Sequence, residues 1–153
     1  MASSITIRQG IPIQGIIING LARFGLLGGM SIKVIPTEAQ EQKVLFEWAE
    51  WAKRRYPELA LLYHIANEGR RSYALGKEMK AQGLRSGVPD ICLPVPRGGY
   101  GALYIEMKRR KDSRLSDNQR GWINGLNRAG NLAVVCKGWE AARDVIIEYL
   151  KGE

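Results

Sequence analysis

Apolar residues recur along most of the chain at two spacings, and each spacing predicts one kind of element. Apolar positions three and four residues apart predict amphipathic helices over 37–55, 73–82, 115–129 and 138–150. Short uninterrupted apolar runs predict buried strands over 59–65, 91–93, 103–108 and 132–136. From residue 37 onward the predicted order is therefore α-β-α-β-β-α-β-α.

The first helix carries two glutamates that are candidates for chemistry. Thr37 is a good N-cap, and Glu38 and Glu41 place acid in the first turns, as the helix dipole prefers. Glu41 lies in line with the apolar stripe through Leu45 and Trp48, so its carboxylate is expected to point toward the core. Both glutamates can be explained as dipole partners, and the alternative is that one of them reaches a catalytic site.

The segment 87–108 contains the strongest candidate for such a site. Two β-prone runs joined by the turn-rich stretch 94–101 predict a hairpin that brings Asp90 and Glu106 together. Side chains two apart on a strand share a face, so Glu106 and Lys108 project together. Converging carboxylates repel unless a proton or a divalent cation relieves them. The order Pro-Asp, then Glu-x-Lys, resembles the PD-(D/E)XK nuclease superfamily, although each half alone also occurs by chance.

The composition limits the classes of protein and partner. With 153 residues, of which 45% are hydrophobic and 25% charged, the chain has the content of one globular domain. A net charge of +8 favours a polyanionic partner, and no basic amphipathic helix supports a membrane surface instead. Cys92 and Cys136 are typical of reduced core cysteines in a cytosolic protein. The single histidine, His64, argues against zinc and against a serine or cysteine triad.

Several basic residues are candidates for phosphate contacts. Five of the seven residues in 108–114 are basic, directly after the proposed catalytic strand. A run of charge is usually a solvated face, but a nucleic-acid backbone would have to lie at this place. The predicted DNA-binding residues are Arg70, Arg71, Arg97, Arg109, Arg110, Lys111 and Arg114.

The N-terminal stretch has an unusual composition. Residues 1–29 contain no acidic residue, six glycines and a run of three isoleucines at 16–18. Its apolar stretches are too short to span a bilayer, and the features of a signal peptide are weak. We expect Met30 to be the natural start, which makes residues 1–29 an extension from a misplaced start, with a loose arm as the alternative. Residues 1–36 precede the predicted domain, and no element and no function is assigned to them.

With these motifs in order, the chain resembles a VRR-NUC domain, a branch of the PD-(D/E)XK nucleases. The ordered pattern G-V-P-D, E-M-K and L-S-x-x-Q is the most specific part of a resemblance that covers residues 37–150. It implies an α/β, restriction-endonuclease-like fold in which helices flank a mixed sheet, with 37–153 as the nuclease domain. The matching segments are 38–42, 67–72, 83–90, 96–99, 105–108, 115–119 and 134–140.

The resemblance also implies roles for the candidate residues. Asp90 and Glu106 would bind Mg²⁺ or Mn²⁺, with the backbone carbonyl of Met107 as a further ligand. Lys108 would orient or activate the attacking water. Gln119 would support the site, and a glutamate of the first helix would complete it.

Two of these roles have alternatives. Ser116 and Gln119 have the spacing of a capping box, which by itself explains the glutamine. The family spacing Glu-x-x-x-Gln fits Glu38, whereas the inward stripe fits Glu41. We rank Glu41 slightly ahead.

Small stand-alone members of this family, typically from phages, resemble Holliday-junction resolving enzymes that work as homodimers. The expected function is a metal-dependent, structure-selective endonuclease, a homodimer acting on branched or duplex DNA in the cytoplasm of a bacterial or phage-infected cell. The alternatives are a nuclease of flaps, nicks or duplex ends, and a basic nucleic-acid-binding module without catalysis. The two acids favour an enzyme, because acids in a phosphate groove repel DNA unless a metal bridges them.

Overall fold

One mixed sheet forms the centre of the molecule. The structure is a computed structural model that describes residues 17–19, 35–66, 73–111 and 113–152. The strand order is β1-β5-β4-β3-β2, with β1, β5 and β4 parallel and β4, β3 and β2 antiparallel. The strands are β1 (Ile17–Asn19), β2 (Tyr63–His64), β3 (Ile91–Leu93), β4 (Leu103–Lys108) and β5 (Leu132–Lys137).

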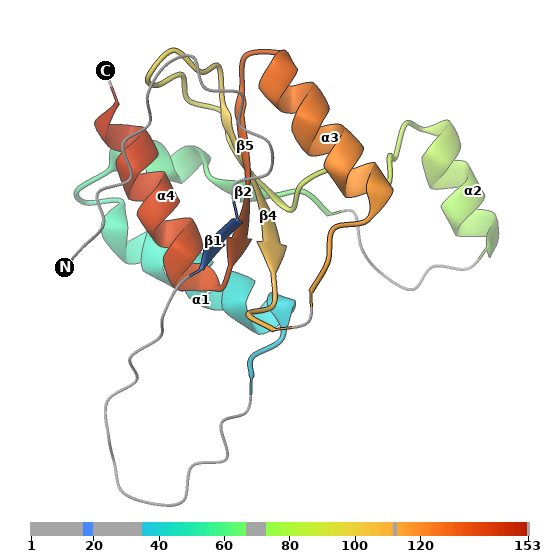
Figure 1. Cartoon of the computed structure of the whole chain (residues 1–153), viewed down its shortest axis with the longest axis horizontal. Coiled ribbons are helices and arrows are strands. Elements are labelled where there is room, and N and C mark those ends of the chain that lie inside the picture. The colour runs from blue at the N-terminus through green and yellow to red at the C-terminus, as the bar shows by residue number, and fades with distance from the viewer. Residues whose placement is uncertain (1–16, 20–34, 67–72, 112, 153) are drawn as a thin grey trace, which may run out of the picture.

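Helices cover both faces of this sheet, as Figure 1 shows: α1 and α4 lie on one face and α3 on the other. This arrangement and the order of elements confirm the predicted α/β fold. None of the described helices is long and apolar enough to cross a bilayer. The helices are α1 (Glu38–Ala52), the short 3₁₀ helix η1 (Pro57–Leu61), α2 (Tyr73–Ala81), α3 (Asp117–Arg128) and α4 (Trp139–Lys151).

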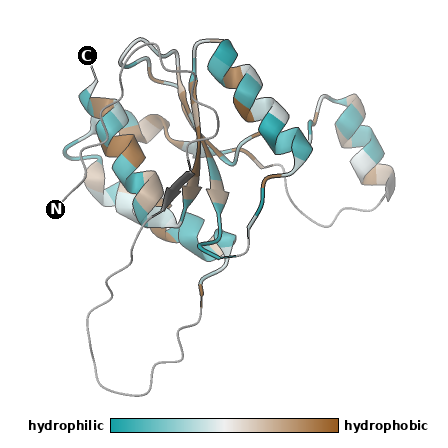
Figure 2. Cartoon of the chain, in the orientation of Figure 1, coloured by the Kyte–Doolittle hydropathy of each residue, from teal (hydrophilic) through white to brown (hydrophobic). Residues whose placement is uncertain are grey.

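Two apolar clusters hold the layers together. The larger joins the sheet to α1 and α4, and the smaller joins the opposite face of β5 to α3. Figure 2 shows apolar colours along the central strands and apolar beside polar colours along the helices that cover them. Fully buried members of the larger cluster are Leu45, Leu59, Ile91, Leu93, Leu103, Ile105, Met107, Cys136, Ala141, Ala142 and Ile146, and the smaller has Ile123, Ala133 and Val135 at its centre.

Alternation along β4 sorts its side chains between these two faces. Ile105 and Met107 belong to the larger cluster, whereas Tyr104 packs against the smaller one. Because successive side chains of a strand point to opposite faces, Glu106 and Lys108 share the face of Tyr104, on which α3 lies. The two polar residues therefore leave the main core intact.

The hairpin predicted between the two β-prone runs is present. β3 and β4 pair antiparallel with Ile91 opposite Ile105 and Leu93 opposite Leu103. One residue beyond the first of these pairs, the same register places Asp90 across from Glu106. A further bridge between Arg97 and Tyr100 closes the turn at the other end of the hairpin.

The segment 59–65 differs from its predicted strand. It begins inside the 3₁₀ helix, and only Tyr63 and His64 pair as the edge strand β2. Pro57 starts the helical turn, and Leu59 and Leu62 are buried while Leu61 between them is exposed. That spacing of three residues is helical, and the apolar content of the run concealed it.

A second difference is β1, which lies within the stretch for which no element was predicted. Its backbone pairs in parallel with β5, Ile17 with Val135 and Asn19 with Lys137, and it forms the edge of the sheet. The pairing partner lies more than a hundred residues away, so no local pattern marks this strand. The run of β-branched isoleucines is the signal that was present.

A buried ion pair ties the start of α1 to the exit of β4 and the start of α4. Glu41 is 2% exposed; its Oε1 accepts from Arg110 Nε at 2.9 Å, and its Oε2 accepts from the Trp139 N–H at 2.9 Å. The guanidinium of Arg110 also pairs with Glu140. Both oxygens of Glu41 are thus engaged in holding three elements together.

Replacing this glutamate should destabilise the fold. Glu41→Ala is expected to lower the free energy of unfolding by about 3–5 kcal/mol, because it leaves a largely buried guanidinium short of one partner. The matched control is Glu47→Ala on the same helix, whose exposed pair with Lys43 spans 3.9 Å and is worth less than about 1 kcal/mol. Urea unfolding measures both, and equal small losses would contradict a structural role for Glu41.

Candidate functional site

The carboxylate of Glu106 is buried at the end of the central strand β4 and only half of it is satisfied. The side chain is 1% exposed. Its Oε1 accepts from Lys108 Nζ at 3.0 Å and from the Gln119 side-chain amide. Its Oε2 is buried and has no hydrogen-bond partner among the described residues. Burying a carboxylate oxygen without a hydrogen-bond partner costs free energy, unless a cation or another polar group approaches it.

The surroundings make ionisation of this acid unfavourable. Burial raises the pKa of Glu106 to about 7, and the nearby negative charges of Asp90 and Glu38 add to the increase. The hydrogen bond and the positive charge of Lys108 act in the opposite direction, but they do not cancel it. Two further carboxylates therefore lie close enough to Glu106 to act on it, and a cation placed among them would favour the ionised form.

Asp90 is held at the mouth of the hairpin by the strands on both sides. Its Oδ2 accepts from the Met107 N–H at 2.7 Å. Its carbonyl oxygen accepts from the Ile65 N–H at 2.7 Å and from His64 Nδ1 at 2.8 Å. The sequence did not indicate the contact with His64, because 26 residues separate the partners.

The two glutamates of α1 have different surroundings. Glu38 reaches the end of β4, where its Oε1 accepts from the Arg109 N–H at 3.2 Å and its charge acts on Glu106. Glu41 points to the core as its place in the stripe predicts, but there it is engaged by Arg110 and Trp139. The geometry therefore favours Glu38 over Glu41, against our ranking, because an inward position leads to the ion pair instead of to the site.

Gln119 serves the helix cap and the site at the same time. Its Oε1 accepts from the Ser116 N–H at 3.0 Å, and Ser116 Oγ accepts from the Gln119 N–H at 3.3 Å, which completes a capping box. Its Nε2 donates to Glu106 Oε1. The two interpretations left open by the sequence are thus compatible: one end of the amide caps α3, and the other end orients the buried carboxylate.

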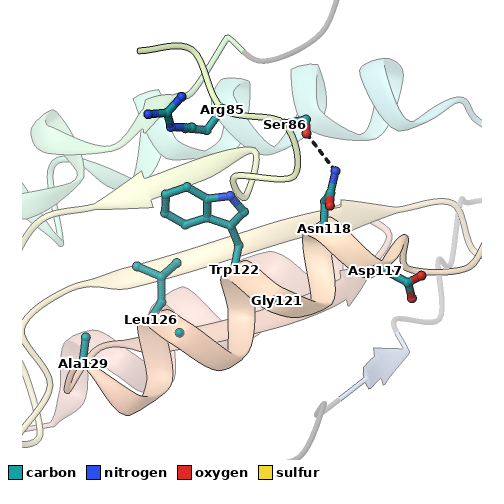
Figure 3. A pocket seen from close by; sticks show the side chains of 9 residues that line it. Arg85, Ser86, Asp117, Asn118, Gly121, Trp122, Leu126 and Ala129 are labelled. Atoms are coloured by element: carbon teal, nitrogen blue, oxygen red, sulfur yellow. Dashed lines mark hydrogen bonds between the residues drawn. The ribbon is translucent and has the colours of Figure 1, made fainter. Parts of the chain in front are cut away.

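A glycine lets the loop before β3 lie directly on this helix terminus. Gly87 has φ +85°, and a Cβ added to it would come within 2.6 Å of the backbone carbon of Asn118. Beside it, Asn118 Nδ2 donates to Ser86 Oγ at 2.8 Å, the contact drawn in Figure 3. The loop that leads to Asp90 and the helix that carries Gln119 are therefore fixed to each other.

The predicted DNA-binding residues fall into three groups. Arg109, Lys111 and Arg114 are exposed beside the site, whereas Arg70 and Arg71 lie outside the described residues.

The other two are engaged within the fold. Arg110 pairs with Glu41 and Glu140, so its guanidinium is committed to the buried ion pair and is not a surface phosphate contact. Arg97 donates to Glu58 at 2.6 Å in the turn at the opposite end of the hairpin from Asp90. Neither position follows from the sequence, since both depend on partners far along the chain.

The residues that are present suit a hard divalent cation. Asp90 and Glu106 offer carboxylate oxygens, and one oxygen of Glu106 has no partner among the described residues. In the described parts of the chain no three His, Cys, Asp or Glu side chains converge closely enough to form a complete metal cage. Mg²⁺ commonly uses one or two protein carboxylates, with water and substrate phosphate as the other ligands, so the pair is sufficient.

Comparison with known proteins gives a consistent result. The sequence model of the VRR-NUC domain family matches residues 31–140. A solved structure described as "VRR_NUC domain protein" is similar with a TM-score of 0.65 and 29% sequence identity, over 76% of this chain and 89% of that chain. No curated protein matches the sequence.

Changing the amide of Gln119 to a carboxylate should separate the cap from the site. In Gln119→Glu one oxygen still accepts from the Ser116 N–H, since glutamate also serves in a capping box, but the other opposes Glu106. The pKa of Glu106 then rises further, so Mn²⁺ binding measured by calorimetry should weaken at neutral pH and recover as the pH increases. Gln40→Glu makes the same change in the capping box of α1 and should leave Mn²⁺ binding unaltered. Equal Mn²⁺ affinity in both variants would show that Gln119 is a cap only.

Proposed function

The chain belongs to the VRR-NUC domain family, which implies a nuclease-type activity on DNA, and we propose that it is a Mg²⁺- or Mn²⁺-dependent endonuclease that hydrolyses phosphodiester bonds. The observation that carries the proposal is the buried Oε2 of Glu106 beside Asp90, for which the described part of the chain offers no hydrogen-bond partner. A structural acid would have its partners within the fold, as Glu41 does. The burial of the Glu106 carboxylate costs free energy, and a bound divalent cation would remove that cost.

The charge distribution supports an enzyme over an inert DNA-binding module. The chain carries a net charge of +8, and exposed Arg109, Lys111 and Arg114 follow the site directly. A surface that only binds phosphate gains nothing from Asp90 and Glu106 at its centre, since they repel the backbone. The combination of a basic surface and an acidic centre suits a site that holds a cation between protein and phosphate.

Each residue of the site has a task in this proposal. Asp90 and Glu106 hold the cation, the carbonyl of Met107 and the carboxylate of Glu38 are the further candidate ligands, and the bound ion supplies Lewis-acid stabilisation of phosphate charge. Lys108, 8% exposed and 3.0 Å from Glu106, provides a fixed positive charge next to the carboxylates.

This lysine is placed to orient or activate the attacking water, because its ammonium donates three hydrogen bonds and only one direction is taken by Glu106. Gln119 is a positioning residue, since it reaches the reaction only through Glu106. The buried setting of Lys108 and Glu106 limits competing water and strengthens their electrostatic effect on the site.

Removing any one of three side chains should abolish cleavage. Asp90→Ala, Glu106→Ala and Lys108→Ala are each expected to reduce DNA hydrolysis in Mn²⁺ by at least about 100-fold, with the fold retained. DNA binding should persist, and it should tighten when an acid is lost. Glu50→Ala, an exposed acid of α1 paired with Lys53, is the control and should cut like the wild type. Robust cleavage by Glu106→Ala would overturn the proposed site.

The proposal extends to the form of the substrate. We place the chain with the small, phage-type members that resolve Holliday junctions, with flaps, nicks or duplex ends as the alternative substrates. A four-way junction presents two phosphates related by a two-fold axis, and a single chain has one acid-acid-lysine centre. A C2 homodimer supplies the second centre with matching symmetry.

Exposed apolar side chains on α1 and in the segment after it are our candidates for the dimer contact. Trp51 on α1 is 79% exposed, and the segment that follows carries exposed Leu61 and Tyr63. A dimer contact would bury these side chains, and exposed apolar surface of this kind is typical of protein interfaces. Tyr100, the aromatic residue in the turn of the hairpin, packs against the main core and is a weaker candidate for the contact.

The dimer should dissociate when this surface is charged. Light scattering is expected to give twice the 17.1 kDa chain mass for the wild type and a single chain mass for Trp51→Glu. Leu75→Glu, at an exposed apolar position of α2, is the matched control and should stay dimeric. A wild-type monomer both free and with junction DNA would contradict the dimer, and the flap or end nuclease would then be the better account.

A further inference from the structure

A groove runs along the outer face of α3, beside the site and distinct from it. It has a volume of about 630 Å³ and lies between α3 and the loop that precedes β3 (Figure 3). Its size is within the range of about 300–1,000 Å³ that is usual for ligand sites. The residues that line it are Arg85, Ser86, Asp117, Asn118, Gly121, Trp122, Gly125, Leu126 and Ala129.

Two glycines in the middle of α3 form the floor of the groove. A Cβ added to Gly121 or Gly125 would meet no described residue within 4 Å. Glycine in a helix interior is destabilising relative to alanine, so a helix with free space at both positions would be more stable with alanine. Nothing in the described fold explains their lack of side chains, whereas a ligand that approaches the helix backbone closely would.

The walls of the groove carry an aromatic ring and a positive charge. Trp122 is partly buried but belongs to neither apolar cluster of the described residues, so the packing of the core does not account for it. Figure 3 shows the indole on the groove side of α3, facing the loop from which Arg85 projects. Arg85 is exposed and offers a guanidinium across from the ring.

Both walls lead to the candidate metal site. The loop wall continues through Gly87, which lies against the backbone of Asn118, to Asp90. The helix wall begins one residue from Gln119, whose amide contacts Glu106. A strand of DNA with its phosphate at the site can therefore continue directly into the groove.

We propose that this groove binds unpaired nucleotides of the DNA substrate, with a base stacked on Trp122 and a phosphate at Arg85. The inference rests on the proposed function for the nature of the ligand. An aromatic platform combined with basic groups is the usual means of holding a single strand without reading its sequence. The glycines allow the sugar-phosphate backbone to approach α3. A base of a duplex is stacked on its neighbours and cannot lie on Trp122, so the groove favours DNA with an unpaired arm or an opened branch point.

Filling the groove tests the proposal. Gly125→Leu places a side chain in open space on α3, and Gly76→Leu makes the same change in α2, where an added Cβ also meets nothing within 4 Å. The probes are a fluorescent blunt duplex and the same duplex with a single-stranded thymidine arm. Binding is measured by fluorescence anisotropy in EDTA, and cleavage is measured separately in Mn²⁺. Thermal melting confirms the fold of each variant.

The wild type and Gly76→Leu are expected to bind the armed duplex more tightly than the blunt one. Gly125→Leu should lose this preference, with a dissociation constant for the armed duplex about tenfold higher or more and an unchanged one for the blunt duplex. Trp122→Ala should behave like Gly125→Leu, and Trp122→Phe should retain the preference because a ring remains. Gly121→Ala should melt at a higher temperature than the wild type.

Two other results would overturn the proposal, and a third would separate it from the proposed nuclease. Wild-type affinity of Gly125→Leu for the armed duplex would exclude the groove while leaving the nuclease intact. Conversion of a wild-type dimer to a monomer by Gly125→Leu would make the groove a contact between two chains instead. If the wild type cuts no DNA in Mn²⁺ yet Gly125→Leu selectively loses the armed duplex, the groove stands and the proposed nuclease fails.

Discussion

The rest of the site depends on the carboxylate of Glu106, which is buried at the end of the central strand and has one oxygen without a partner in the described structure. The register of the β3–β4 hairpin creates this situation, because it places Asp90 across from Glu106 and fixes it through the Met107 N–H. A slip of one residue would turn Glu106 into the main core and Met107 toward α3. The same pairing that forms the sheet therefore concentrates negative charge at one point.

The acidic residues near the site have two different roles: some stabilise the fold, and others are candidates for the chemistry. Glu41 and Glu38 start the same helix, yet Glu41 closes an ion pair with Arg110 while Glu38 lies near Glu106. Gln119 links the two purposes, because one end caps α3 and the other end orients Glu106. Stability and the candidate chemistry thus meet at the N-terminal ends of two helices, where polar groups are already required.

Local patterns predicted the parts that depend on local physics. Periodicity gave the helices, and two β-prone runs around a turn gave the hairpin that joins Asp90 to Glu106. The structure differs from the predictions where the partner lies far along the chain. Arg110 was expected at the surface, but it pairs with Glu41 and Glu140. No strand was predicted at β1, because its pairing partner β5 is distant in the sequence. The ranking of the two glutamates of α1 has the same explanation. A residue on the inward side of a helix can face either the core or the site, and the sequence does not distinguish the two.

The central claim is that the fold buries the carboxylate of Glu106 at a free-energy cost that a bound divalent cation removes. The effect of pH and of Mg²⁺ on the stability of the fold tests this claim most directly. Because the pKa of Glu106 is raised from 4.5 to about 7, the folded protein binds more protons than the unfolded chain between these values, and its stability falls as the pH rises. Unfolding of the wild type and of Glu106→Gln should be compared across this range, with and without Mg²⁺. Above pH 7 the wild type should be less stable than the variant by up to about 3 kcal/mol, at about 1.4 kcal/mol for each unit of pKa. Mg²⁺ should restore the wild type and leave the variant little changed. The account would be contradicted if the free energies of unfolding of the two proteins changed in parallel with pH and responded equally to Mg²⁺.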